Sequence, residues 1–205
     1  MQNMTKIKLC GMTRPCDIET VNALKPDYIG FVFAKKSKRY VTPETAAEFK
    51  EKLDKDIKSV GVFVNEDQDI VAGLLEKGVI DLAQLHGDED DAYIESLKAR
   101  TGNEVIKALK IRQKEDLKAA YESSADFILL DAGAGDGKAF DWELLKDFDR
   151  PYFLAGGLDP YNVGDAIRWL HPFGVDVSSG IESDGVKDPG LMKKFMDEVR
   201  RENKN

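Results

Sequence analysis

The sequence predicts an eight-stranded βα barrel of the α/β class, and three observations carry this prediction. Short apolar runs alternate with helical patterns eight times along 205 residues, which is near the lower limit of roughly 200 residues for such a barrel. Several of the runs are almost continuously hydrophobic, as in parallel strands that are buried on both faces. No linker or low-complexity stretch interrupts the alternation. We therefore expect residues 1–205 to form a single (βα)8 TIM barrel domain.

The expected strands are short runs rich in Val, Ile and Phe, and the expected helices are amphipathic segments between them. In chain order the strands are Ile7–Met12, Tyr28–Phe33, Ser59–Val64, Leu82–His86, Val105–Ile111, Phe127–Asp131, Tyr152–Ala155 and Val175–Ser178. The helices include Pro43–Leu53, Gln68–Lys77, Asp90–Arg100, Asp116–Tyr121, Asn162–Leu170 and Pro189–Arg201. Thr42 and Asp188 each precede a proline, which suits the first turn of a helix.

Strict alternation predicts parallel strands joined by right-handed crossovers, in either a closed barrel or an open doubly wound sheet. An open dinucleotide-binding sheet would carry GxGxxG after its first strand. Here Cys10-Gly11-Met12-Thr13-Arg14 follows instead. Eight uninterrupted strands also favour closure. The barrel is therefore the preferred architecture.

Composition excludes several classes of partner. Hydrophobic residues make up 42% and charged residues 33%, and the net charge is −8 with both signs interspersed. Clustered Lys and Arg residues are needed to bind a nucleic acid, so we expect neither a nucleic-acid nor a membrane partner. No apolar run reaches the ~20 residues that span a bilayer, and the N-terminus lacks a signal-peptide pattern. Cys10 and Cys16 form no disulfide or metal-binding pattern, which favours a cytoplasmic location. The sequence does not fix the oligomeric state, and we expect a monomer or a homodimer.

The turns after the last two predicted strands suit a phosphate group. In such barrels the active site lies at the C-terminal ends of the strands, and the loops after strands seven and eight often hold phosphate. Glycine lets backbone N–H groups approach the anion closely. The residues concerned are Gly156, Gly157, Ser178, Ser179 and Gly180, although glycines can also serve only to make tight turns.

Cys10 and Asp131 end the first and sixth predicted strands and are candidates for acid–base chemistry. Lys8 lies on the same face as Cys10, and a nearby cation favours a thiolate. A buried cysteine is otherwise a small hydrophobic residue. A carboxyl group at the rim of an apolar barrel is costly to ionise, which suits a general acid. Asp131 could instead cap a helix or bind the glycine-rich loop after it.

Arg39 lies in a run of basic residues after the second strand, where a guanidinium could bind a substrate carboxylate in bidentate fashion. Such runs are usually solvated loops. His86 could contact a ligand or belong to the core, whereas His171 precedes Pro172 and is expected to be structural. No HxH or HExxH spacing is present, so we expect no metal site.

These residues together resemble the phosphoribosylanthranilate isomerase family, a βα-barrel family of tryptophan biosynthesis. The resemblance runs in order from Lys6 to about Phe195. Its motifs are Lys8–Thr13, Gly30–Phe33, Ser37–Val41, Gln84–Gly87, Leu130-Asp131, Gly137–Trp142, Leu154–Leu158, Asp176–Glu182 and Gly185–Asp188.

The resemblance implies an Amadori rearrangement of N-(5-phosphoribosyl)anthranilate by general acid–base catalysis, without a metal or organic cofactor. It implies that Asp131 is the general acid and Cys10 the general base, and that Arg39 holds the anthranilate carboxylate. The remaining residues implied by the match bind the phosphate or line the substrate: Gly156, Gly157, Ser179 and Gly180 for the phosphate, and Asp176 and His86 for the substrate.

Two departures from the family pattern are visible. Lys38 stands where the family often has proline, so this loop should be less rigid. The loop after Asp131 is short, and we expect a changed lid.

Three other functions of such a barrel would each need residues that differ from those in this sequence. A sugar-phosphate epimerase would need metal-ligand histidines. The isomerase of histidine biosynthesis would have an aspartate where Cys10 stands. A non-catalytic barrel should have lost Cys10 or Asp131.

Overall fold

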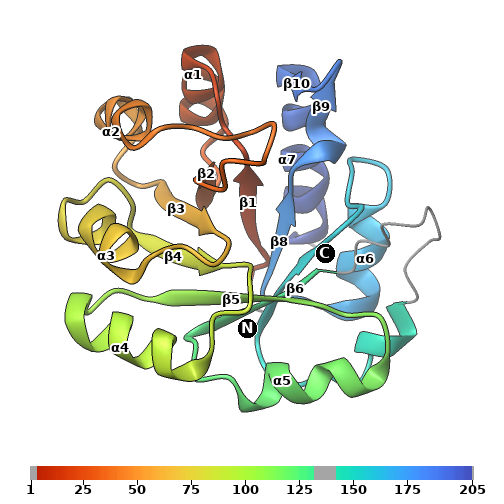
Figure 1. The fold of residues 1–205 in the computed structure, drawn as a ribbon. Coiled ribbons are helices and arrows are strands. Elements are labelled where there is room, and N and C mark those ends of the chain that lie inside the picture. Colours follow the sequence, from red (N-terminus) through yellow and green to blue (C-terminus); the bar gives the residue numbers. More distant parts are fainter. Residues whose placement is uncertain (1–3, 132–141, 205) are drawn as a thin grey trace.

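The computed structural model describes residues 4–131 and 142–204, and within them eight parallel strands close into a barrel (Figure 1). Each strand pairs with the next, and β8 returns to pair with β1 through Lys6↔Gly174 to Leu9↔Val177. The strands are β1 Lys6–Cys10, β2 Tyr28–Val32, β3 Lys58–Phe63, β4 Leu82–Leu85, β5 Val105–Lys110, β6 Phe127–Asp131, β7 Tyr152–Ala155 and β8 Gly174–Val177. All eight predicted strands are confirmed, with ends that differ by no more than two residues.

Helices surround the barrel, as Figure 1 shows. They are α1 Pro15–Leu24, α2 Pro43–Lys52, α3 Gln68–Glu76, α4 Asp91–Thr101, α5 Leu117–Glu122, α6 Val163–Leu170 and α7 Pro189–Glu202. The six helix ranges expected from the sequence are confirmed. Two of them begin as predicted, because Thr42 accepts a hydrogen bond from the Thr45 N–H and Asp188 accepts one from the Leu191 N–H.

The helices predicted from the sequence did not include α1. It begins at Pro15 because the buried Asp17 carboxylate accepts the backbone N–H groups of Thr13 and Arg14. Cys16 lies at the start of this helix and is exposed, so it takes no part in the core. His171 ends α6 in a left-handed conformation, which agrees with the structural role expected for it.

Alternate residues of each strand point into the barrel, as the two-residue period of a strand requires. At the N-terminal end the interior is filled by aromatic rings, with Phe153 packed edge-on against Tyr28, Phe127 and Phe173 at centroid distances of 5.5, 5.9 and 5.3 Å. A smaller group, Cys10, Val32 and Val62, lies nearer the opposite end. Because aromatic rings fill the interior at the N-terminal ends of the strands, a binding site has room only at their C-terminal ends.

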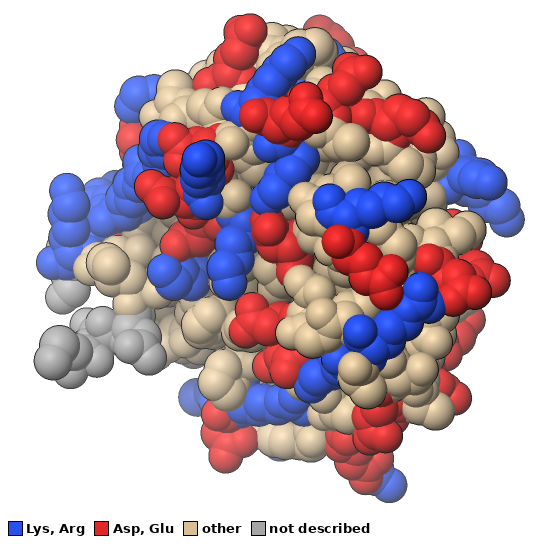
Figure 2. Space-filling model, turned by 90° about the vertical axis from the view of Figure 1, so that its left-hand side faces the viewer, with Lys and Arg blue, Asp and Glu red and all other residues tan. Residues whose placement is uncertain are grey.

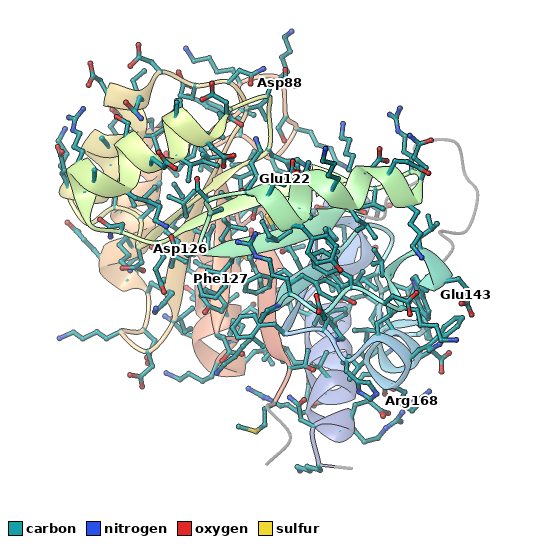
Figure 3. All side chains as sticks on the ribbon, turned by 90° about the horizontal axis from the view of Figure 1, so that it is seen from below. Asp88, Glu122, Asp126, Phe127, Glu143 and Arg168 are labelled. Atoms are coloured by element: carbon teal, nitrogen blue, oxygen red, sulfur yellow. The ribbon has the colours of Figure 1, made fainter. Side chains whose placement is uncertain are left out.

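Three 3-10 helices and a hairpin complete the described chain. The short helices are η1 Lys114–Asp116, η2 Trp142–Leu145 and η3 Ser179–Ile181. Trp142 of η2 contacts Trp169 of α6, and the labelled Glu143 and Arg168 mark these two neighbouring elements in Figure 3. The hairpin, β9 Glu182–Ser183 and β10 Val186–Lys187, was not predicted. The glycine-rich loop 132–141, for which a changed lid was expected, lies outside the described residues.

The surface carries both signs of charge. On the face shown in Figure 2, Lys and Arg side chains alternate with Asp and Glu side chains. In the described part of the chain, every helix is too short or too polar to cross a membrane.

Candidate active site

A cavity of about 340 Å³ opens at the C-terminal ends of the strands. It brings together residues from β1, β4, β6 and β8 and from the loops after β2, β7 and β8. Of the residues predicted from the sequence, it is lined by Cys10, Arg39, His86, Asp131, Gly156, Gly157, Asp176, Ser178 and Ser179. Gly180 does not line it.

Cys10 lies at the end of β1, and the neighbouring strand leaves room for its thiol. Gly30 of β2 is its register partner, and a Cβ at Gly30 would fall 2.5 Å from the Cys10 Sγ. The Ser178 hydroxyl donates to the Cys10 carbonyl oxygen at 3.1 Å. Glycine at position 30 is therefore what allows the thiol to occupy the edge of the cavity.

Lys8 is fully buried two residues before Cys10, and its ammonium donates to Asp176 Oδ1 at 2.9 Å. Burial lowers the pKa of Lys8, but Asp176 and Cys10 raise it, and the net pKa lies above the ordinary 10.5. Asp176, expected to line the substrate, thus also neutralises a buried cation. A charged pair is required here, since an isolated ammonium would be very costly to bury.

The expectation that Lys8 would favour a thiolate is only partly met. Burial raises the pKa of the Cys10 thiol above its ordinary 9.0, while Lys8 and Lys187 lower it. Asp176 also raises it, because its carboxylate opposes a second negative charge nearby. The net pKa is raised, so the site holds a thiol at neutral pH.

Asp131 ends β6, three strands away from β1 around the barrel in the order β6, β7, β8, β1. Its Oδ2 lies 3.3 Å from His86 Nε2, at the end of β4, although this nitrogen lacks hydrogen-bond geometry. The sequence had suggested both residues as candidates but not that they touch. Acid and thiol therefore face one cavity from opposite sides of the barrel.

A buried ion pair braces the loop that carries His86. Glu89 accepts hydrogen bonds from the Asn65 N–H at 2.7 Å and the Gly87 N–H at 2.9 Å. Lys107 of β5 donates to Glu89 at 3.1 Å and to the Gly87 carbonyl oxygen at 2.8 Å. This carboxylate therefore ties the ends of β3 and β4 to β5.

The glycine turns after β7 and β8 approach each other closely. Gly156 and Gly157 both have positive φ, 90° and 68°. A Cβ at Gly180 would lie 1.9 Å from the Leu158 carbonyl oxygen, so no larger residue fits. The backbone conformation and the close approach of these turns therefore require glycine at these positions. Gly156, Gly157 and Ser179 also line the cavity.

Arg39 is already engaged by an acid of the chain. Its Nε donates to Glu182 Oε1 at 2.5 Å and its Nη2 to Glu182 Oε2 at 2.9 Å. Burial raises the pKa of Glu182, but Arg39 and Lys187 lower it, to a net value of about 2. Arg39 therefore forms a bidentate pair, but its partner is Glu182 of the chain and not the substrate carboxylate that the sequence analysis assigned to it.

Sequence reasoning missed three groups at this site. Lys187 and Glu182 belong to the unpredicted hairpin, and only their place within family motifs could have indicated them. Gln84 lines the cavity, and its buried Oε1 has no hydrogen-bond partner among the residues described. It lies two residues before His86, and this spacing on a strand was the available signal.

Comparisons with known proteins agree with this geometry. Residues 7–198 match the family profile described as N-(5'-phosphoribosyl)anthranilate (PRA) isomerase. The N-(5'-phosphoribosyl)anthranilate isomerase of Endomicrobium trichonymphae is 48% identical over 190 residues, covering 90% of this chain and 93% of that protein.

Two solved structures have closely similar folds, and each covers 97% of this chain and all of the other. One is a dimeric phosphoribosylanthranilate isomerase from Thermotoga maritima studied as monomers, with 36% identity and a TM-score of 0.86. The other is a phosphoribosylanthranilate isomerase in complex with reduced 1-(o-carboxyphenylamino)-1-deoxyribulose 5-phosphate, with 36% identity and a TM-score of 0.85. The chain belongs to the N-(5'-phosphoribosyl)anthranilate isomerase family.

Proposed function

We propose that this chain catalyses the Amadori rearrangement of N-(5'-phosphoribosyl)anthranilate to 1-(2-carboxyphenylamino)-1-deoxyribulose 5-phosphate in tryptophan biosynthesis. The observation that carries the proposal is the shared cavity, which Cys10 and Asp131 line from opposite sides. Its volume of about 340 Å³ falls in the usual range for small-molecule sites, roughly 300–1,000 Å³.

Asp131 is the general acid in this proposal. It gives a proton to the furanose ring oxygen, the bond from C1′ to that oxygen breaks with its electrons staying on oxygen, and the nitrogen lone pair forms a protonated Schiff base. The His86 Nε2 atom lies 3.3 Å from the Asp131 carboxyl group and contacts it from β4.

Cys10 is the general base. After the thiol has released its own proton to water, the thiolate removes the proton from C2′, the electrons of that C–H bond form the C1′–C2′ double bond, and the C1′=N electrons return to nitrogen as its lone pair. The resulting enolamine becomes the ketone when C1′ takes up a proton and the C2′ hydroxyl loses one. The positive charge of the Schiff base favours a thiolate nearby, which offsets the raised pKa of Cys10. The substrate supplies its own electron sink, so we propose no metal or organic cofactor.

Binding roles follow from the cavity lining. Arg39 receives the anthranilate carboxylate, and Asp176 with His86 lines the sugar. The backbone of Gly156, Gly157, Ser178 and Ser179 receives the phosphate, since glycine turns allow close approach of N–H groups to an anion. Gly180 lies outside the cavity lining and contributes by allowing the close approach of its turn to Leu158. We also propose that the chain acts in the cytoplasm, as a monomer or a homodimer.

The test is the loss of anthranilate fluorescence when the protein is mixed with freshly made phosphoribosylanthranilate. Asp131→Asn and Cys10→Ala should each lower kcat by about 10²–10⁴-fold, the usual contribution of an acid or base. Cys16→Ala, the matched control, alters an exposed thiol and should leave kcat unchanged. Wild-type kcat in Cys10→Ala would refute the assignment of the base, and an inactive wild-type chain would refute the function.

A further inference from the structure

Arg39 presents two different edges for pairing with carboxylates, and the chain itself occupies one of them. Glu182 takes the side edge, formed by Nε and Nη2. Nη1 enters no hydrogen bond with any described residue, which leaves the end edge of Nη1 and the second Nη2 hydrogen. A guanidinium has five N–H donors in a rigid planar fork. Fixing one edge therefore fixes the direction of the other.

Glu182 is itself held in place. Lys187 donates to its Oε1 at 2.8 Å, and Lys38 lies 3.4 Å from its Oε2. The side chains of Glu182 and Lys187 are 6% and 1% exposed. Buried charges with several partners lose the rotamer freedom that weakens surface ion pairs. The hairpin thus provides a rigid carboxylate for Arg39.

Lys187 links the same hairpin to the Cys10 side of the cavity. Its ammonium donates to the Ser178 carbonyl oxygen at 2.8 Å, and it lies 3.3 Å from the Ser178 hydroxyl. That hydroxyl donates to the Cys10 carbonyl oxygen. Neither Glu182 nor Lys187 lines the cavity, whereas Arg39, Ser178 and Cys10 all do. The hairpin residues therefore act on a ligand in this cavity through these three residues and through their charge.

We propose that Glu182 and Lys187 are positioning residues that direct the end edge of Arg39 toward the substrate carboxylate and thereby set the preference of the site for a carboxylated aromatic amine. The inference rests on the proposed role of Arg39. Around Glu182 stand three cations, Lys38, Arg39 and Lys187. The single carboxylate does not cancel their charge, so the Arg39 edge still attracts a second carboxylate.

The experiment compares two ligands by calorimetry. One is reduced 1-(o-carboxyphenylamino)-1-deoxyribulose 5-phosphate, and the other is its aniline counterpart, which lacks the carboxylate. Wild-type protein should prefer the carboxylated ligand by about 10- to 100-fold, as for a hydrogen-bonded charged group. Glu182→Gln should lose most of this preference, with its affinity for the aniline ligand unchanged within about twofold.

The matched control is Glu76→Gln, since Glu76 also accepts from an arginine Nε, that of Arg100, but at the surface. It should keep the full preference. Glu182→Asp retains the charge at a shorter reach, and it should show an intermediate preference. This variant carries the test if Glu182→Gln does not fold.

The possible results distinguish the positioning role of Glu182 and Lys187 from the proposed role of Arg39. A full preference in both Glu182 variants would overturn the inference and leave the role of Arg39 standing. Equal loss of affinity for both ligands would indicate a purely structural ion pair, which also overturns it. A wild-type protein without any preference would refute the proposed role of Arg39 and the inference together.

Discussion

Adding one methyl group beside Cys10 should cost this protein most of its turnover. In Gly30→Ala the new Cβ would lie 2.5 Å from Sγ, 3.1 Å from Cα and 3.2 Å from Cβ of Cys10. Non-bonded carbon atoms prefer about 3.5–4.0 Å, so the thiol must move by roughly 1 Å. The two strands cannot separate easily, because the Gly30 carbonyl oxygen accepts from the N–H groups of Gly11 and Met12 at 2.9 and 3.1 Å.

A shift of about 1 Å in a reacting group can cost about 10²-fold in rate, and overpacking a core costs typically about 1–3 kcal/mol. We therefore expect kcat of Gly30→Ala to fall by about 10²-fold and its thermal midpoint to fall by about 2–12 °C. The fluorescence assay measures the first and calorimetry the second.

The matched control for this substitution is Gly73→Ala in α3. A Cβ there meets no atom within 4 Å, and alanine favours a helix over glycine by about 1 kcal/mol. This variant should keep kcat and gain slightly in stability. If Gly30→Ala kept wild-type kcat and midpoint, the position assigned to the Cys10 thiol would be wrong.

Three further outcomes are expected. Because the pKa of Glu182 is lowered to about 2 in the folded chain, its ionised form stabilises the fold fully above pH 4.5, and this stabilisation is lost as pH falls toward 2. The difference in unfolding free energy between wild type and Glu182→Gln should therefore shrink by about 2 kcal/mol between pH 6 and pH 3. A difference that stays constant with pH would contradict this prediction. In a Cys16→Ser background, alkylation of Cys10 by iodoacetamide should reach half its maximal rate above pH 9.0, and a midpoint at or below that pH would disprove the raised pKa. Glu89→Gln leaves the buried Lys107 ammonium without its carboxylate and should lower the free energy of unfolding, measured in urea, by about 3–5 kcal/mol. The double variant Glu89→Gln/Lys107→Met should recover most of this loss. An equal loss in both variants would show that the ion pair is not the cause.

The barrel was predictable because its signal is local and repeated. A strand buried on both faces must be almost wholly apolar, and β6 and β7 were placed with their observed ends for this reason. Catalytic candidates followed from the same rule, since polar residues that end such strands face the rim. This reasoning identified Cys10 and Asp131 as candidates, and the structure places both on one cavity, at opposite sides.

The same reasoning could not predict the hairpin β9–β10, whose Glu182 pairs with Arg39. Residues 182–187 form only two short strands, and their composition is that of an ordinary polar loop. Nothing in the sequence pattern pairs Glu182 with Arg39, which lies 143 positions earlier. The direction in which Arg39 presents its guanidinium therefore depends on a tertiary contact that becomes visible only in the folded chain.

The pKa of Cys10 has the same origin and bears on the order of the reaction. The sequence places Lys8 near the thiol, but folding pairs that ammonium with Asp176 and buries the thiol, so the net pKa rises. Lys187, also nearby, offsets the rise only in part. A thiol with a raised pKa is a poor base until a positive charge forms beside it. In the proposed mechanism, proton transfer from Asp131 creates that charge when the ring opens, and removal of the C2′ proton therefore follows ring opening.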